Sequence, residues 1–389
     1  MNTPPAEDLA NVVPFRITVP EADLEDLRRR LNATRWPLEE PGVGWEEGVP
    51  LAYIRELADY WRTSYDWRIA EARLNEFPQC KTEIDGATVH FFHARSPEPD
   101  ALPLIITHGW PGSVVEFIDV IGPLVDPRAH GGDAADAFHV VAPSIPGYGF
   151  SGPPTEAGWD VSRVGRAWSE LMSRLGYHRY GAQGGDWGSA ISQHLGRIDP
   201  ARVIGIHLNL LITPPPPGGF DLEELSAEDR RAAQAHQEFI SQRSGYMQVN
   251  ATQPQTLAYA LSDSPVGQLA WIVDKMMEWS CARAVPEEAI DRDLMLTNVM
   301  LYWLTGTAGS SARLYQTLTG ERSPSMRVEV PTAVALFPCD IARPVRAWAN
   351  QAANIVRWTE IDRGGHFAAL EAPELLVDDV RAFFRTLRP

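Results

Sequence analysis

An aspartate at the tip of a glycine-rich turn is the residue in this sequence with the clearest chemical potential. Residues 184–189 read Gly-Gly-Asp-Trp-Gly-Ser, between a short apolar run and a segment of helical character. Small residues on both sides of Asp186 let the backbone turn sharply and expose one side chain, as in a nucleophile elbow. The ordinary alternative is a chance turn, because glycine and aspartate are both common in turns.

A carboxylate at such an elbow predicts displacement at a saturated carbon. Its attack forms an alkyl ester of the enzyme, which water can open at the Asp186 carbonyl carbon. A serine at the same place would form an ether, which hydrolysis could not clear. Aspartate is also ionised near pH 7 and needs no base for the first step. The expected reactions are therefore epoxide opening and dehalogenation.

Two later residues are candidates for a base and for the acid that orients it. His366 follows two glycines just past a predicted strand at 355–361, and Asp340 follows another at 328–337. The order nucleophile, acid, histidine is that of the elbow fold, in which the acid orients the imidazole and the imidazole deprotonates water. The alternatives are a surface-loop histidine, a helix N-cap at Asp340, and Asp362 as a rival acid.

Developing negative charge on oxygen must also be stabilised. The backbone N–H groups of Trp187 and Trp110 are expected to form an oxyanion hole for ester hydrolysis. Opening an epoxide needs in addition an acid on the departing oxygen, a role that suits a phenol. The side chains themselves do not choose among four candidates in the later part of the chain, Tyr246, Tyr259, Tyr302 and Tyr315.

Strands and helices are predicted to alternate around the elbow. Continuous apolar runs at 102–107, 138–143 and 203–211 indicate buried parallel strands, with helical patterns between them. This alternation predicts an α/β fold with a mostly parallel sheet and helices on both faces. A run of prolines and glycines at 214–219 breaks the pattern, and the largely helical residues 221–325 are expected to form a cap inserted into the sheet domain.

The composition limits the partners. The 389 residues carry a net charge of −17, which argues against nucleic acid or an anionic membrane surface. Three widely spaced cysteines, Cys80, Cys281 and Cys339, show no metal-ligand spacing and predict reduced thiols in a cytoplasmic protein. No apolar run reaches the ~18 residues of a membrane span, and no signal peptide is recognisable at the N-terminus.

Several motifs together resemble those of the microsomal-type epoxide hydrolases. Besides the elbow, they are His108-Gly109-Trp110-Pro111-Gly112-Ser113, Ser244-Gly245-Tyr246-Met247, Asp263-Ser264-Pro265-Val266-Gly267, Thr297-Asn298-Val299-Met300-Leu301-Tyr302-Trp303 and Gly365-His366. The similarity runs from about residue 12 to the end of the chain. The resemblance therefore covers nearly the whole sequence.

The resemblance implies an α/β-hydrolase fold in three parts. An N-terminal family-specific segment (1–95) would pack on the core and the cap. The core would comprise 96–213 and 326–389, with a helical cap at 214–325 between its two halves. The chain resembles the soluble bacterial branch, without the membrane anchor of the mammalian enzymes.

The resemblance also assigns roles by position. It places the nucleophile at Asp186, the base at His366 and the ring-activating phenols at Tyr246 and Tyr315. The relay acid falls on Asp340, where many relatives carry glutamate. No metal or organic cofactor is implied.

The leading hypothesis is an epoxide hydrolase that releases a vicinal diol from a small hydrophobic or aromatic epoxide. A haloalkane dehalogenase is an alternative, since the Trp187 indole could hold halide, although Trp110 stands where a halide-binding asparagine would be expected. A non-catalytic binder of small ligands is another alternative, but such a protein would not need an acid and a base, Asp340 and His366, in catalytic order after the elbow.

The sequence leaves several properties open. These are the epoxide itself, the regiochemistry and enantiopreference, and the choice between detoxification and secondary metabolism. A homodimer is one candidate oligomeric state. Candidate pocket walls in the cap are Trp271, Met276, Met277 and Trp279.

Overall fold

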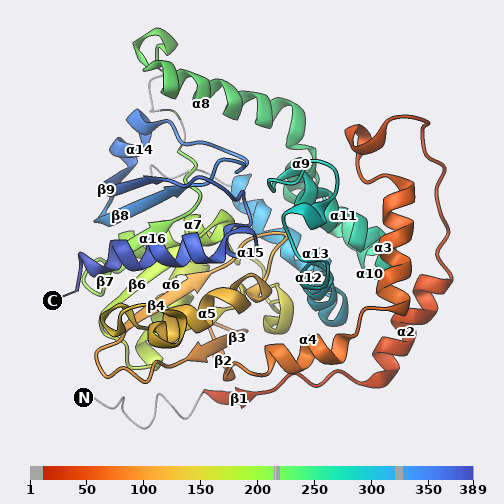
Figure 1. Cartoon of the computed structure of the whole chain (residues 1–389), viewed down its shortest axis with the longest axis horizontal. Helices are drawn as coiled ribbons and strands as arrows, with labels where there is room; N and C mark the ends of the chain where they lie inside the picture. The colour runs from red at the N-terminus through yellow and green to blue at the C-terminus, as the bar shows by residue number, and fades with distance from the viewer. Residues whose placement is uncertain (1–11, 214, 216–219, 320–326, 389) are drawn as a thin grey trace.

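The computed structural model describes residues 12–213, 215, 220–319 and 327–388 (Figure 1). Its described strands form one sheet in the order β1-β2-β3-β5-β4-β6-β7-β8-β9. The strands are β1 (Val13–Phe15), β2 (Gln79–Ile84), β3 (Ala87–Ala94), β4 (Leu102–Thr107), β5 (Phe138–Pro143), β6 (Tyr180–Gly184), β7 (Val203–Leu208), β8 (Val328–Leu336) and β9 (Ala353–Glu360). Pairs from β5 through β9 are parallel, whereas β1, β2 and β3 pair antiparallel.

Helices cover both faces of this sheet. They include α5 (Ile118–Val125), α6 (Val161–Arg174), α7 (Asp186–Ile198), α14 (Arg346–Ala352), α15 (Ala368–Glu371) and α16 (Pro373–Arg385). Paired glycines at 181 and 205 leave room for Phe384 and Phe383 of α16, while Gly184 faces α7. Because alternate residues of a strand point to opposite faces, α16 and α7 lie on opposite sides of the sheet. The predicted α/β class with a mostly parallel sheet is confirmed.

A second group of helices follows β7 in the chain. These cap helices are α8 (Ala227–Glu238), α9 (Gly245–Thr252), α10 (Pro254–Asp263), α11 (Pro265–Glu278), α12 (Arg292–Thr305) and α13 (Ala308–Ala312). They agree with the predicted helical character of 221–325. The proline–glycine run at 214–219 falls almost wholly outside the described residues, as do 320–325, so the predicted cap limits stay a prediction.

The N-terminal helices pack against the cap helices. They are α2 (Glu21–Asn32), α3 (Leu51–Thr63) and α4 (Trp67–Leu74). Helices α2 and α3 contact α11 and lie on the side of the cap helices that faces away from the sheet (Figure 1). Helix α4 contacts α12 and lies between α2 and the edge of the sheet at β2. The division at residue 95 is not a break in the sheet, because β1–β3 extend its edge.

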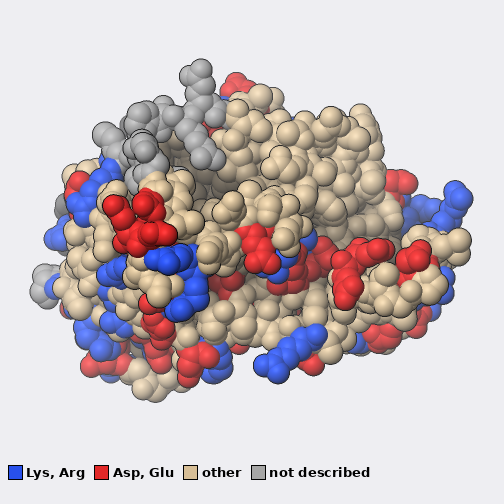
Figure 2. All heavy atoms as spheres, turned by 90° about the horizontal axis from the view of Figure 1, so that it is seen from above, with Lys and Arg blue, Asp and Glu red and all other residues tan. Residues whose placement is uncertain are grey.

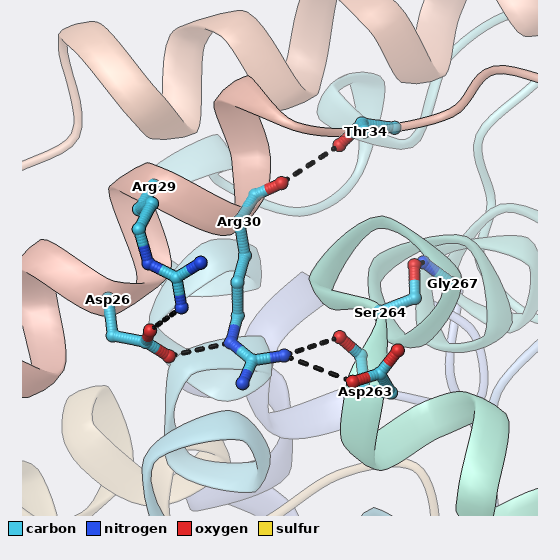
Figure 3. Close-up of polar contacts among 7 residues, drawn as sticks. All are labelled: Asp26, Arg29, Arg30, Thr34, Asp263, Ser264 and Gly267. Carbon is cyan, nitrogen blue, oxygen red and sulfur yellow. Dashed lines mark hydrogen bonds and ion pairs between the residues drawn. The ribbon is translucent and has the colours of Figure 1, made fainter.

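One arginine joins the N-terminal segment to the junction of α10 and α11. Arg30 Nη1 donates to Asp263 through its carbonyl oxygen (3.0 Å) and its Oδ1 (3.2 Å), and Arg30 Nε donates to Asp26 (2.6 Å) (Figure 3). Ser264 caps α11 by accepting from the Gly267 N–H at 2.9 Å. The Asp263–Gly267 motif therefore shapes a helix junction and anchors it to α2.

The prediction of three reduced thiols is wrong for two of them. Cys281 and Cys339 form a disulfide across 58 residues of sequence, with their Cα atoms 5.2 Å apart, while Cys80 is free. Cys281 follows α11 and Cys339 follows β8, so the bond links the cap helices to the sheet. Sequence spacing gave no sign of this contact because the fold alone brings the two segments together.

Acidic and basic side chains are mixed over the face shown in Figure 2. The net charge of −17 is therefore not gathered into one single-sign surface on this face. Across the part of the chain that the structure describes, no helix has the length and apolar character needed to cross a bilayer.

Candidate active site

Asp186 is the first residue of α7, directly after β6 and Gly185. Its φ of +47° lies in the left-handed region that residues other than glycine rarely adopt. A Cβ at residue 184 would overlap the Gly188 backbone, and a Cβ at 188 would overlap the Thr107 carbonyl. The flanking glycines thus allow the close approach of strand and helix that holds Asp186 in this strained backbone.

A backbone donor already faces the Asp186 carboxylate. The Trp110 N–H, in the loop after β4, donates to Asp186 Oδ1 at 2.8 Å. The Trp187 N–H lies in the first turn of α7, where backbone donors have no partner within the helix. The two predicted oxyanion-hole residues therefore lie on two segments that meet at the elbow, and the Trp110 N–H is in hydrogen-bond contact with Asp186.

The structure brings His366 and Asp340 to the same carboxylate. His366 Nδ1 lies 2.8 Å from Asp340 Oδ1, and His366 Nε2 lies 3.4 Å from Asp186 Oδ2. The backbone N–H of His366 donates to the backbone carbonyl of Trp279 at 2.9 Å, which ties the histidine loop to the end of α11. The His366 and Asp340 side chains are only 3% and 5% exposed. Asp340, His366 and Asp186 therefore contact one another in that order, with the imidazole between the two carboxylates.

The alternatives for Asp340 do not match the structure. Helix α14 begins at Arg346, so Asp340 does not cap a helix. Besides His366, it accepts from the Ile341 N–H at 2.7 Å. The rival acid Asp362 is exposed.

Two carboxylates determine the charge of the imidazole. Burial alone would lower the pKa of His366, but Asp340 and Asp186 outweigh it and raise that pKa to about 10. The imidazole is therefore charged at neutral pH while Asp186 is a free carboxylate. If Asp186 loses its charge, the pKa of His366 therefore falls.

Tyr246 and Tyr315 flank the elbow from the cap side. The Tyr246 ring stacks on Trp110 with centroids 5.4 Å apart, and Tyr315 meets Trp110 and Trp187 edge-on at 5.7 and 4.9 Å. Burial and the nearby Asp186 charge raise the pKa of both phenols. Both therefore stay protonated and can donate to an oxygen held between them.

The other two candidate phenols are placed differently. Tyr302 donates to the Gly112 carbonyl at 2.6 Å, and Tyr259 is 71% exposed. Tyr246 and Tyr315, the two phenols to which the resemblance assigns the role, are therefore the ones whose rings contact Trp110.

Two tryptophans, Trp271 within α11 and Trp279 directly after it, also lie against Trp110. The rings of Trp271 and Trp279 lie 6.4 and 6.1 Å from the Trp110 ring, edge-on. Met276 is fully buried and Met277 only partly so. No group of three or more metal-ligand side chains occurs in the described ranges.

Sequence reasoning missed two acidic side chains next to these residues. Glu371 accepts from the Phe367 N–H (3.1 Å) and the Cys281 N–H (2.9 Å), and burial raises its pKa to about 7. Glu116 lines a small cavity together with Asp186 and His366. The one available signal for Glu116 is its position three residues after Ser113, the spacing of a capping box.

Comparisons with known proteins identify the family of this chain. Residues 12–117 match the family model described as the epoxide hydrolase N terminus, and 103–373 match the α/β hydrolase fold. A Stigmatella aurantiaca protein, provisionally named as an epoxide hydrolase, is 49% identical over 97% of this chain and 86% of its own length. The chain belongs to the epoxide hydrolase family. Epoxide hydrolase 1 of Sus scrofa is 35% identical over 99% of this chain and 91% of its own.

Solved structures of epoxide hydrolases agree with this assignment. The Aspergillus niger epoxide hydrolase superposes with a TM-score of 0.87 at 33% identity, covering 96% of both chains. The juvenile hormone epoxide hydrolase of Bombyx mori gives 0.89 at 30% identity, covering 99% of this chain and 98% of that one. The shared fold therefore includes the N-terminal helices and the cap helices.

Proposed function

We propose that this epoxide hydrolase converts a small hydrophobic or aromatic epoxide into a vicinal diol through an ester on Asp186. The observation that carries the proposal is the carboxylate at the elbow, held by Trp110 through Oδ1 and flanked by two protonated phenols. With Oδ1 so held, Oδ2 attacks a ring carbon and the ring C–O bond breaks. Tyr246 and Tyr315 bond the departing oxygen, and one of them gives it a proton.

Ester formation changes the electrostatics of His366. Asp186 becomes neutral, so the pKa of His366 falls from its resting value of about 10, to which Asp186 contributes. The imidazole gives up its proton, which restores the phenol, and becomes a base while Asp340 still orients it. The charge change thus converts His366 into a base at the step that needs one.

The second step returns the enzyme to its starting state. Water attacks the Asp186 carbonyl carbon as His366 Nε2 takes its proton, and the negative charge on Oδ1 is met by the Trp110 N–H. The intermediate collapses with cleavage of the bond to Oδ2, which leaves with the diol and takes a proton from His366. The proton that remains on the new Asp186 carboxyl group passes to His366, which restores the carboxylate and the charged imidazole. One oxygen of Asp186 is therefore replaced by an oxygen of water in every cycle.

Labelled water tests this exchange. In a single turnover in ¹⁸O-water, the first diol should carry no label, while the Asp186 peptide should gain one heavy oxygen by mass spectrometry. Later turnovers in the same water should give labelled diol. Direct entry of label into the first diol, with none at Asp186, would show that water attacks the epoxide without an ester.

Removal of either flanking phenol should slow ring opening. Tyr246→Phe and Tyr315→Phe are each expected to lower the alkylation rate by about 10²-fold, the effect of losing one donor to a developing oxyanion. Tyr259→Phe is the matched control, since that phenol is exposed and lies on α10, in the same group of cap helices. Stopped-flow quenching of tryptophan fluorescence would measure the rates. Equal rates in all three variants would contradict the role of the phenols.

One observation favours the dehalogenase alternative. The buried Trp187 Nε1 has no acceptor among the described residues, so it could hold a halide. The paired phenols Tyr246 and Tyr315 and the family membership favour the epoxide instead. Release of chloride from a haloalkane, without diol from any epoxide, would reverse this choice.

The biological setting stays a prediction. The Cys281–Cys339 disulfide removes the argument for a cytoplasmic location from reduced thiols, so that location rests on the remaining sequence features. The homodimer and the choice between detoxification and secondary metabolism likewise rest on the sequence alone.

A further inference from the structure

The Cys281–Cys339 disulfide lies directly beside the acid and the base of the site. Cys339 precedes Asp340 in the chain, and its backbone N–H donates to the Gly364 carbonyl at 3.2 Å, two residues before His366. Cys339 also forms a parallel bridge with the residue between those two. One half of the disulfide therefore belongs to the short backbone pairing that brings the Asp340 and His366 segments together.

The other half of the disulfide belongs to a segment that holds the same histidine loop. Trp279, two residues before Cys281, accepts the backbone N–H of His366 at 2.9 Å. The Cys281 N–H donates to Glu371 Oε2 at 2.9 Å, and Glu371 Oε1 accepts from the Phe367 N–H at 3.1 Å. The residue before His366 is a glycine, and a Cβ there would lie 2.7 Å from the Trp279 carbonyl oxygen. The end of α11 is thus packed closely against the histidine loop.

We propose that the Cys281–Cys339 disulfide is a redox-sensitive brace that keeps Asp340 and His366 aligned for ester hydrolysis. Two thiol sulfurs cannot remain at bonding distance, so reduction obliges the Asp340 loop and the end of α11 to separate or rotate. Asp340 then loses its alignment with His366 Nδ1, which lies 2.8 Å from Asp340 Oδ1 while the bond is intact. This inference rests on the proposed ester mechanism and concerns only its second step.

A dithiol is the class of reductant that would open this bond. Its thiolate attacks one cysteine sulfur to give a mixed disulfide, and its second thiol then displaces that cysteine. Two electrons and two protons pass to the enzyme, and the dithiol becomes a disulfide. Both cysteines keep part of their surface accessible, and Pro338 beside Cys339 is exposed. The bond therefore lies close to solvent, within reach of a small reductant.

A disulfide that only stabilises the fold makes a different prediction. A cross-link across 58 residues constrains the unfolded chain, so its loss lowers the melting temperature wherever it lies. That effect has no reason to slow one half-reaction at temperatures where the protein stays folded. The brace predicts such a selective effect, because Asp186 and the Trp110 N–H lie on other segments, directly after β6 and in the loop after β4.

The pH profile of ester hydrolysis gives a second readout. Burial lowers the pKa of His366, whereas Asp340 and Asp186 raise it, and Glu116 and Glu371 are the other acids near the imidazole. In the ester Asp186 is neutral, so Asp340 is the acid still bonded to the imidazole. If reduction moves Asp340 away, the pKa of His366 falls further. Hydrolysis speeds up as the imidazole loses its proton, so its profile should shift to lower pH, whereas lower stability alone leaves the midpoint unchanged.

The test compares oxidised wild type, wild type treated with dithiothreitol, and Cys281→Ser/Cys339→Ser in single turnovers of a styrene-type epoxide. Reduction should raise the thiol count from one to three per chain. A misplacement of about 1 Å can cost about 10²-fold, so we expect ester hydrolysis to slow roughly tenfold or more in both disulfide-free forms. Alkylation should stay within about twofold of the oxidised enzyme. Reoxidation should restore hydrolysis, and Cys80→Ser, the matched control, should respond to dithiothreitol as wild type does.

Several outcomes would overturn the proposal. Unchanged hydrolysis and an unchanged pH midpoint in the disulfide-free forms would show a purely stabilising role, and equal slowing of both steps would show a general loosening of the site. Failure of dithiothreitol to expose any thiol besides Cys80 in the folded enzyme would exclude redox sensitivity. If the double serine variant does not fold, the reduced wild type decides, and its unfolding would also contradict the brace. If His366→Gln forms no ester at all, the mechanism itself fails, independently of the disulfide.

Discussion

Asp186→Asn is expected to lower kcat/KM for epoxide hydrolysis by roughly 10⁴-fold or more, the scale of losing a catalytic nucleophile. The amide nearly matches the carboxylate in shape, so the hydrogen bond from the Trp110 N–H to Oδ1 can persist. It lacks the negative charge that attacks the ring carbon. The loss should therefore appear in the alkylation step, with little change in stability.

The matched control is Asp362→Asn. Asp362 lies in the same site region, four residues before His366, but is exposed. It should retain activity within about twofold, as surface substitutions usually do. Diol formation measured by chromatography, with a fluorescence assay for the ester, would compare the two. Full turnover by Asp186→Asn from the first minutes would contradict the ester mechanism.

The sequence predicted those parts of the fold that local pattern determines. Strands β4 and β5 have the predicted limits, 102–107 and 138–143, because strands that are buried on both faces consist of continuous apolar runs. The elbow was predictable for a related reason. Its small residues at 184 and 188 are required by backbone contacts within a few residues of Asp186 and with the neighbouring strand.

What the sequence could not predict depends on contacts between distant segments. The Cys281–Cys339 disulfide joins the segment after α11 to the segment after β8, and no spacing rule connects two such positions. For the phenols, the residue pattern alone left four candidates open, and only the family resemblance placed the role at Tyr246 and Tyr315. The contact of Tyr302 with a backbone carbonyl is a property of the fold.

Glu116 shows the same limit within the site. Its spacing from Ser113 indicates a helix cap, which is a local role that can be predicted from the sequence. Its position at a cavity shared with Asp186 and His366 is a property of the fold. Local patterns and the family resemblance therefore located Asp186, His366 and Asp340, whereas the cavity beside them is visible only in the fold.

His366→Gln is expected to stop the reaction at the ester. Alkylation does not require a base, because Asp186 attacks as a carboxylate, whereas ester hydrolysis loses roughly 10²–10⁴-fold without its general base. The expected result is a stable adduct whose mass exceeds that of the free protein by the mass of the epoxide, on the peptide that contains Asp186. Intact-protein mass spectrometry and peptide mapping would measure it.

The pH dependence of the wild type should separate the same two steps. With Asp186 ionised, the pKa of His366 is about 10, so the imidazole is charged during alkylation at neutral pH. Once Asp186 is an ester, that pKa falls, and hydrolysis should speed up as pH rises through the lowered value. His130→Gln, at an exposed position, is the control and should show neither adduct nor altered profile. Rapid hydrolysis in His366→Gln, with no adduct at any pH, would mean that another group activates the water.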